Sequence, residues 1–267
     1  MLQLYDAHNH LQDERLNPYR DDITEMLPGI GLVKAVVAGS SVEDWPHVAE
    51  LARRYDWVLP SFGVHPWYVR QQPDDWSVQL RNWLSSFPQA GVGEIGLDRW
   101  RQDADVPMQT RFFADQLSIA AEHRRPVSIH CLRAFGLLEE ALRSSPKIEP
   151  GFLLHSYGGP PEMVPIFTKL GGYFSVSPYF LHERKARQWQ TFATVPIDHL
   201  LVETDAPDMW PPPALNPRRL IGTEAAELNH PANIELMYHE LAALRGISVD
   251  ALADIVRENF TRLFGLA

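Results

Sequence analysis

The sequence predicts an α/β protein built as a single (β/α)8 TIM barrel. Eight short apolar runs alternate with amphipathic stretches along the chain. Corresponding residues near the ends of successive runs stand 22 to 36 positions apart, which is the length of one strand and its crossover helix. A chain of 267 residues with 45% hydrophobic content can bury the core of one such barrel, so we expect one domain over residues 1–267.

The strand-like runs carry the predicted topology, because parallel strands need a helical crossover between them. In chain order the runs are LYDAHNH, LVKAVVAG, WVLPSFGVHP, AGVGEIGLD, PVSIHC, GFLLHS, GGYFSVSP and LLVETDAP. The last residue of interest in each run is, in the same order, His10, Gly39, His65, Glu94, His130, His155, Ser177 and Asp205. Eight units favour a closed barrel over an open doubly wound sheet, and no GxGxxG phosphate-binding loop follows the first run.

Helical periodicity is clear in three stretches. Pro107 can open a helix in which apolar residues recur at spacings of four and three, namely Phe113, Leu117 and Ala120. The stretch 231–244 repeats this arrangement. Ser248 is expected to cap a last helix with one apolar face.

The composition excludes several classes of protein. Cys131, the single cysteine, can form neither an intrachain disulfide nor a cysteine-rich zinc site. The chain opens without a basic and apolar signal segment, and no apolar stretch approaches the roughly 20 residues that span a bilayer. We therefore expect a soluble cytoplasmic protein without a membrane partner. A net charge of −10 argues against a broad surface for long duplex DNA.

Six side chains with metal-ligand chemistry stand at equivalent ends of these runs. They are His8, His10, Glu94, His130, His155 and Asp205. Because the carboxyl ends of barrel strands surround one mouth, we expect these side chains to meet there and to bind metal. Each alone has an ordinary alternative. HNH can occur by chance in a loop, the glutamate can form a surface salt bridge, and the later histidines can be hydrogen-bonded core residues. Their matching positions favour the metal site.

Sequence spacing indicates how these ligands are arranged. His8 and His10 are two apart on a strand and share a face, so both imidazoles can reach one metal ion. Asp6 shares that face and is a candidate to orient one imidazole. Apolar neighbours surround Glu94, where a lone carboxylate would be costly without a cation or a partner. No lysine follows a run, which argues against a carbamylated-lysine bridge between two metals.

Asp205 closes the last run and is our candidate both to contact metal and to take a proton from the attacking water. A metal ion can lower the pKa of that water to near 7. Glu203 shares the face of Asp205 and is either a supporting residue behind the site or a buried acid paired with a neighbour. Mg²⁺ or Mn²⁺ suits a carboxylate-rich site, and four imidazoles would also accept Zn²⁺.

The chain resembles the TatD family of metal-dependent deoxyribonucleases, in the amidohydrolase-like superfamily of TIM barrels, essentially from end to end. The matching segments are YDAHNHL at the start, GVHP at 63–66, GEIGLD at 93–98, SIHC at 128–131, LHSYGG at 154–159, ETDAP at 203–207 and NHPANI at 229–234. GEIGLD, with HxH before it and ETDAP after it, is the specific part.

The resemblance implies that the six candidate ligands bind two divalent metal ions, with Glu94 bridging and Asp205 assisting water attack. It also implies hydrolysis of DNA, as a 3′–5′ exonuclease on single strands or ends, and a substrate contact for His65. Three departures bear on substrate preference. Trp67 stands where HPH often has its second histidine, Leu132 beside Arg133 replaces an arginine, and HSYGG replaces the usual HCFSG.

Aromatic and basic residues follow the same strand ends. Arg99, Trp100, Arg133 and Tyr157 are candidates to hold phosphates and to stack on unpaired bases of single-stranded DNA. The alternative is that such tryptophans pack the long loops down. Residues 206–230 show no clear period and are expected to form a lid over the mouth.

Two other functions stay open on the residues alone. The same barrel and ligands can serve hydrolysis of a small ester, amide or lactone, because a fold does not fix a function. A noncatalytic protein can also keep metal for structure, although structural zinc sites are usually closed by four protein ligands. The basic and aromatic residues at the strand ends favour nucleic acid.

Overall fold

The computed structural model describes residues 2–221 and 227–265. Eight parallel strands form one sheet in which each strand pairs with its neighbour in sequence. They are β1 (Leu4–Asn9), β2 (Leu32–Ala38), β3 (Val58–Phe62), β4 (Gly91–Asp98), β5 (Val127–Leu132), β6 (Phe152–Leu154), β7 (Gly172–Val176) and β8 (Leu200–Val202). The two edges meet where Asp205 N–H donates to His8 O at 2.9 Å and His10 N–H donates to Ala206 O at 2.7 Å. The predicted (β/α)8 barrel is confirmed.

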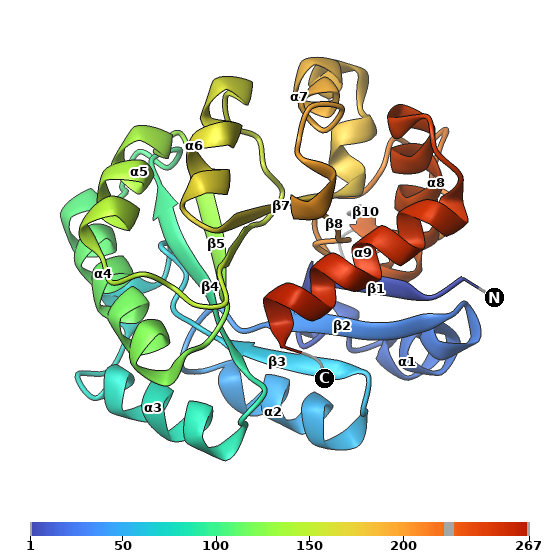
Figure 1. Cartoon of the computed structure of the whole chain (residues 1–267). Helices are drawn as coiled ribbons and strands as arrows, with labels where there is room; N and C mark the ends of the chain where they lie inside the picture. The colour runs from blue at the N-terminus through green and yellow to red at the C-terminus, as the bar shows by residue number, and fades with distance from the viewer. Residues whose placement is uncertain (1, 222–226, 266–267) are drawn as a thin grey trace.

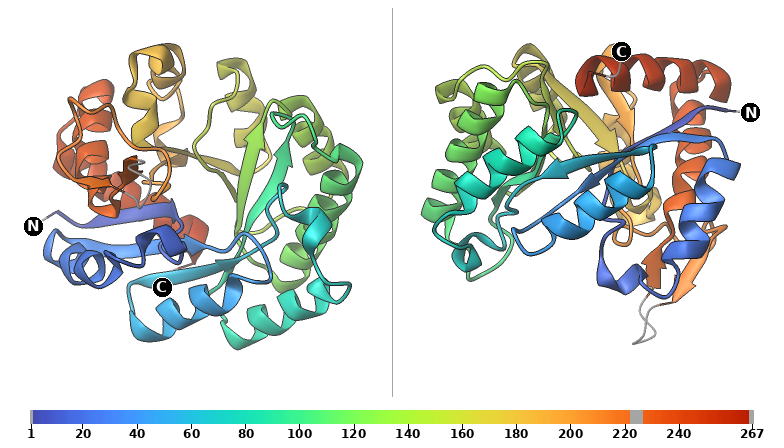
Figure 2. Two further views of the ribbon diagram at one scale, coloured as in Figure 1. Left: turned by 180° about the vertical axis from the view of Figure 1, so that it is seen from behind. Right: turned by 90° about the horizontal axis from the view of Figure 1, so that it is seen from below.

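Helices surround this sheet (Figures 1 and 2). They are α1 (Arg20–Gly29), α2 (Trp45–Arg54), α3 (Trp76–Ser86), α4 (Val106–His123), α5 (Phe135–Ser144), α6 (Val164–Lys169), α7 (Ala186–Thr191), α8 (Ile234–Arg245) and α9 (Val249–Phe264). Short 3₁₀ turns are η1 (Glu14–Leu16), η2 (Val69–Gln71), η3 (Pro161–Met163), η4 (Pro178–Leu181), η5 (Glu183–Lys185), η6 (Ile197–His199) and η7 (Pro231–Asn233). In the described parts of the chain, none of the helices is long and apolar enough to cross a membrane.

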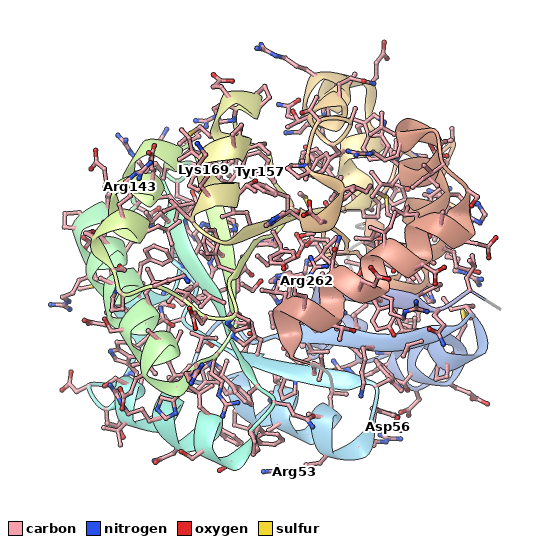
Figure 3. All side chains as sticks on the ribbon, viewed as in Figure 1. Arg53, Asp56, Arg143, Tyr157, Lys169 and Arg262 are labelled. Atoms are coloured by element: carbon pink, nitrogen blue, oxygen red, sulfur yellow. The ribbon has the colours of Figure 1, made fainter. Side chains whose placement is uncertain are left out.

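The apolar core lies within the barrel and between its strands and helices. Parallel strands are covered on both faces, which is why the runs read as nearly continuous apolar sequence. α9 lies across β1 and β8 (Figure 1), with the Phe260 ring 5.0 Å from that of Tyr5. Charged side chains such as Arg53 and Arg143 point outward from the helices into solvent (Figure 3). Apolar side chains therefore fill most of the barrel, and the polar groups of the site lie at the carboxyl ends of the strands.

The predicted helix signals are present. α4 begins at Val106, with Pro107 in its first turn, and Asp105 Oδ1 accepts a hydrogen bond from Met108 N–H at 3.1 Å. Ser248 caps α9 by accepting from the Ala251 N–H at 3.2 Å. α8 starts a little later than expected, because the first residues of the stretch 231–244 form the 3₁₀ turn η7.

Two glycines allow β4 to lie close against β5. Gly96 has φ +149°, and a Cβ there would lie 1.9 Å from the carbonyl oxygen of His130. A Cβ on Gly93 would lie 2.7 Å from Ser128 Cβ. Only glycine fits both positions without displacing β5, and this close approach brings Glu94 beside His130.

The segment 206–230 contains regular structure that its sequence does not indicate. β9 (Arg219–Ile221) and β10 (Glu227–Asn229) pair antiparallel, while residues 222–226 lie outside the described residues. Asn229 fastens the segment to the barrel, since its N–H donates to Pro207 O at 2.8 Å and its Nδ2 donates to Thr204 O at 2.7 Å. The sequence shows no clear period for these two short strands, and the action of the segment as a lid stays a prediction.

Candidate metal centre

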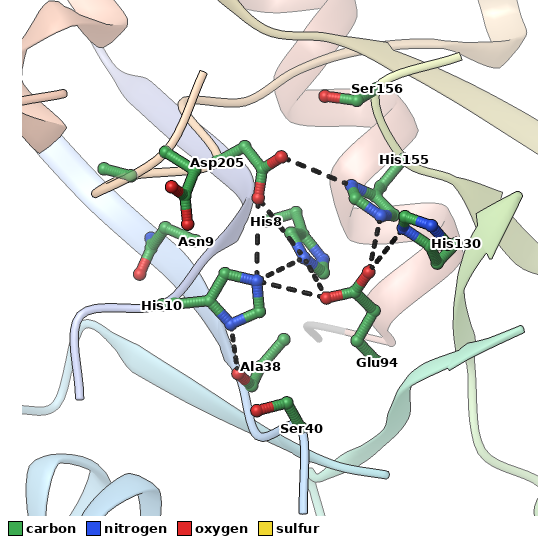
Figure 4. A network of polar contacts seen from close by, with 12 residues as sticks. His8, Asn9, His10, Ala38, Ser40, Glu94, His130, His155, Ser156 and Asp205 are labelled. Atoms are coloured by element: carbon green, nitrogen blue, oxygen red, sulfur yellow. Dashed lines mark hydrogen bonds and ion pairs between the residues drawn. The ribbon is translucent and has the colours of Figure 1, made fainter. Parts of the chain in front are cut away.

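The six predicted ligands come together in one cluster at the barrel mouth (Figure 4). His8 lies within β1, and His10 follows that strand directly. His155 follows β6 and Asp205 stands three residues beyond β8. Glu94 and His130 lie inside β4 and β5 rather than past their ends, since β4 continues to Asp98 and β5 to Leu132.

One oxygen of Glu94 faces the residues from the first and last strands. Its Oε2 lies 3.4 Å from His8 Nε2 and 3.1 Å from His10 Nε2. The same two nitrogens lie 3.8 Å and 3.6 Å from Asp205 Oδ1. They are only 3.3 Å from each other. The Nε2 atoms of both histidines thus lie close to two carboxylate oxygens, Glu94 Oε2 and Asp205 Oδ1.

The other oxygen of Glu94 faces a separate set of imidazoles. Its Oε1 lies 2.8 Å from His155 Nε2 and 3.0 Å from His130 Nδ1. His65 Nε2 completes this set at 3.4 Å. His65 is buried and lies within reach of the same carboxylate as the predicted ligands, so it belongs to the cluster itself.

The donor set fits divalent cations. Three triads have ligand atoms within 4.8 Å of one another: His8, His155 and Asp205; His8, His10 and Glu94; and His65, Glu94 and His130. His155 Nδ1 is buried without a hydrogen-bond partner among the described residues. Clusters of imidazole nitrogen and carboxylate oxygen are ligands for Zn²⁺ and for the harder divalent ions.

The Nδ1 atoms of His8 and His10 contact partners that the sequence did not reveal. His8 Nδ1 lies 2.8 Å from Ser128 Oγ, and His10 Nδ1 lies 2.7 Å from the carbonyl oxygen of Ala38. Such contacts fix the ring orientation and leave Nε2 of each imidazole directed at Glu94.

Asp6 does not orient an imidazole ring as expected. Its carboxylate turns toward the end of β8, where it accepts from Thr204 Oγ1 at 2.6 Å and from Thr204 N–H at 3.0 Å. It also accepts from the backbone N–H of His8 at 3.2 Å. Asp6 therefore fixes the backbone junction of β1 and β8, and burial, which outweighs these hydrogen bonds, raises the pKa of its carboxyl to about 7.

Asp98 is a site residue that sequence reasoning missed. Its Oδ2 lies 2.9 Å from His130 Nε2 and accepts from Trp67 Nε1 at 2.8 Å. Its Oδ1 accepts from the backbone N–H of Trp100 at 2.6 Å. The signal was available, because Asp98 stands four residues after Glu94 within GEIGLD, at an even strand spacing.

Glu203 is fully buried behind His155. It accepts hydrogen bonds from Ser156 Oγ at 2.5 Å and from Ser175 Oγ, and its Oε1 lies 3.6 Å from His155 Nδ1. Both sequence interpretations are thus represented, since Glu203 is paired with its neighbours and also lies directly behind a candidate ligand.

The electrostatics of the cluster centre on Glu94. Burial alone would raise the pKa of its carboxyl, but the imidazoles of His155 and His65, with hydrogen bonds from His10 and His130, hold that pKa well below its usual range. Burial likewise disfavours charge on His10, yet its hydrogen bond to Glu94 and the nearby carboxylates raise the pKa of His10 to about 10. Glu94 remains an anion around which positive charge is stabilised.

The pKa shifts of other members of the cluster favour their uncharged forms. Burial and the neighbouring His155 lower the pKa of His8 to about 4. Burial also lowers the pKa of His65 to about 4, against the attraction of Glu94. Burial raises the pKa of Asp205 to about 8, against the attraction of His155 and His10. Neutral imidazoles are the form that binds a metal ion.

The predicted substrate-contact residues separate into two groups. Arg99, Trp100 and Arg133 are exposed at the ends of β4 and β5, as expected of residues on the rim. Tyr157 is a correction: it is 2% exposed, its hydroxyl donates to Pro160 O at 2.7 Å, and its ring packs 5.0 Å from Phe174. Tyr157 is a core residue and is not available to stack on a base.

Comparison with known proteins identifies the family of the chain. The model of the TatD related DNase family matches residues 5–265. The chain belongs to this family. A 3′-5′ ssDNA/RNA exonuclease TatD from Shigella flexneri is 28% identical over 99% of the chain and 100% of the relative. The uncharacterized metal-dependent hydrolase YcfH from Escherichia coli K12 is 29% identical over 98% of the chain and 95% of the relative.

Solved structures show the same fold. The TatD homologue YJJV from Escherichia coli K12 superposes with a TM-score of 0.89 at 24% identity, over 99% of the chain and 98% of that protein. A TatD family hydrolase from Entamoeba histolytica gives a TM-score of 0.82 at 18% identity, with 98% of each chain covered. The protein is thus a TatD-family hydrolase with a candidate metal centre at its barrel mouth.

Proposed function

We propose that the protein is a divalent-metal-dependent exonuclease that hydrolyses phosphodiester bonds from the 3′ end of single-stranded DNA. The observation that carries this proposal is the position of Glu94, whose two oxygens face two separate sets of ligand atoms. A carboxylate in this position can bridge two cations, which is the arrangement used by many phosphodiester hydrolases. The TatD relative named as a 3′-5′ ssDNA/RNA exonuclease supports the choice of substrate.

The proposed ligand sets follow from the two sides of Glu94. His8, His10 and Asp205 would hold one cation with Oε2, and His130 and His155 would hold the other with Oε1. Bound cations would polarise the phosphate and lower the pKa of the attacking water. Mg²⁺ or Mn²⁺ suits the carboxylates, and the four imidazoles also suit Zn²⁺.

Asp205 is the proposed acceptor for the proton that the attacking water loses. It lies at the mouth, with Oδ1 toward His8 and His10 and with Oδ2 3.9 Å from His155 Nδ1. Burial raises its pKa to about 8. A nearby cation would lower that pKa toward neutrality, where a general base is most effective.

The proposed substrate contacts lie beside the second ligand set. β4 and β5 pair Asp98 with Leu132, so the residues that follow, Arg99 and Arg133, stand next to each other on the rim. Both are exposed and can contact phosphates, while the half-exposed Trp100 offers a ring for an unpaired base. His65, within 3.4 Å of Glu94, is the proposed contact closest to the scissile phosphate.

Cleavage of a 5′-labelled single-stranded oligonucleotide with Mg²⁺ or Mn²⁺ tests the proposal. We expect a ladder that shortens from the 3′ end and disappears with chelator or in Asp205→Asn. Asp208→Asn is the matched control and should leave cleavage intact, because this half-exposed aspartate on the same loop pairs with Arg15. Intact DNA after incubation with metal-loaded protein would contradict the proposal and point to a small ester, amide or lactone as substrate.

A further inference from the structure

The segment that follows β7 carries a basic cluster that the proposed mechanism does not use. We call residues 179–187, YFLHERKAR, the β7 basic segment. It includes the turn η5 and begins three residues after the end of β7. In a (β/α)8 barrel this position lies on the same face as the carboxyl ends of all strands, and therefore on the face that carries Glu94.

Two cationic side chains of the segment lie against the ring of Tyr179. The Arg184 guanidinium lies 5.0 Å from the centroid of Tyr179, and its Nη2 donates to the tyrosine hydroxyl at 2.7 Å. Lys185 Nζ lies 5.2 Å from the same centroid. Cation–π contacts of this kind hold the two positive groups in place near each other. Partial burial and the charge of Arg184 lower the pKa of Lys185, as expected of cations held together.

These cations have no carboxylate partner among the residues that the structure describes. Within residues 2–221 and 227–265, no ion pair includes Arg184, Lys185 or Arg187. Three cations in four positions, with Glu183 as the one acid beside them, stand out in a chain of net charge −10. An anion bound there would offset their mutual repulsion.

The segment is joined to the metal centre through the loops on either side. His182 Nε2 lies 3.2 Å from the carbonyl oxygen of Trp210, on the loop that follows Asp205. Ser177 Oγ, just before the segment, lies 2.7 Å from Ser156 Oγ, and the Ser156 hydroxyl donates to Glu203. The cations therefore stand on a loop anchored to the groups behind the candidate ligands.

We propose that the β7 basic segment binds phosphates of a single-stranded nucleic acid at nucleotides beyond the scissile bond. Arg184, Lys185 and Arg187 supply the positive charge, and they extend the rim contacts of Arg99 and Arg133 past the end of β6. The inference rests on the proposed function, because it assumes that the substrate is a polynucleotide. It predicts that long substrates depend on the segment and that the shortest ones do not.

The test compares Arg184→Gln/Lys185→Gln with Arg124→Gln/Lys147→Gln. The control pair removes the same two charges from exposed residues that precede β5 and β6, at the opposite end of the barrel. We expect the first variant to lose roughly tenfold in kcat/KM on a 12-nucleotide strand while a dinucleotide changes by less than about twofold. The slope of log KM against the logarithm of the salt concentration should also fall by about 1.4, since each of the two lost phosphate contacts contributes about 0.7 to that slope on single strands. The control variant should match the wild type in both.

Equal activity of both variants on the 12-nucleotide strand would overturn the inference and leave the exonuclease proposal standing. If the wild type cleaves neither substrate, the proposed function fails, and anisotropy of a labelled 12-nucleotide strand with chelator then tests the segment directly. Weaker binding by Arg184→Gln/Lys185→Gln alone would support the inference, and equal binding would overturn it. An acidic polypeptide that competes as well as DNA would also overturn it.

Discussion

Asp98 Oδ2 lies 2.9 Å from His130 Nε2, on the opposite side of the imidazole from Glu94. Burial alone would lower the pKa of His130, but the hydrogen bonds to Asp98 and Glu94 raise it. The neutral ring that binds metal would donate its Nε2 proton to Asp98 and present the Nδ1 lone pair to the cation. Asp98 thus selects the tautomer of a candidate ligand.

Replacing this carboxylate tests its role. Asp98→Asn weakens the acceptor for His130, so we expect the affinity for Mn²⁺ to fall about 10- to 100-fold. Calorimetric titration of the metal-free protein measures it. Asp103→Asn removes an exposed acid that pairs with Arg101 and should bind Mn²⁺ like the wild type. Unchanged affinity in Asp98→Asn would show that His130 does not need the Asp98 carboxylate at its Nε2 to bind Mn²⁺.

Trp67 provides a second way to alter the same acceptor. Trp67→Phe keeps an aromatic ring but removes the indole N–H that donates to Asp98. The loss of one such bond is worth about 1 kcal/mol, so Mn²⁺ affinity should fall about fivefold. Trp100→Phe is the matched control, because the donor of Trp100 to Asp98 is its backbone N–H. A fall of the same size in the control would contradict the account.

His230 predicts a pH dependence of stability. Its Nδ1 accepts from Ala232 N–H at 2.9 Å, and burial lowers its pKa to about 4. The unfolded chain takes up this proton near pH 6.5, so the free energy of unfolding should fall as the pH drops from about 6.5 to 4, by up to roughly 3 kcal/mol. Urea unfolding measures it. His230→Asn keeps a capping acceptor and should flatten the profile; an identical profile would contradict this prediction.

Gly96 should tolerate no side chain. Gly96→Ala would place Cβ 1.9 Å from His130 O at φ +149°, so we expect a loss of more than about 3 kcal/mol in the free energy of unfolding. Gly136, in α5, has open space around its Cβ position, and Gly136→Ala should be neutral or stabilising by up to about 1 kcal/mol. Denaturant unfolding of the two variants measures both changes, and equal stability would show that β5 can shift away from β4.

The strands and most of the cluster could be predicted because they follow simple periods. Buried parallel strands are apolar on both faces, and the ends of eight such strands converge on one mouth whatever the loops between them. His8 and His10 share a face because their spacing is two. This is why matching positions in the sequence were enough to bring His155 and Asp205 together with them.

Tyr157 and Asp6 could not be assigned in the same way. Ser156 has φ +42°, and the turn it makes directs Tyr157 back into the core although it stands two residues from a candidate ligand. The partner of Asp6 is Thr204, almost two hundred residues away. Contacts of this kind depend on loop conformation and on pairings across the closed barrel, which local patterns do not encode.

Glu94 would bridge two cations in the metal-loaded protein, and anomalous diffraction from crystals grown with Mn²⁺ tests this arrangement most directly. We predict two Mn²⁺ peaks, one beside Glu94 Oε2 with His8 and His10 and one beside Oε1 with His130 and His155. A single peak, or peaks away from the Glu94 carboxylate, would contradict the account.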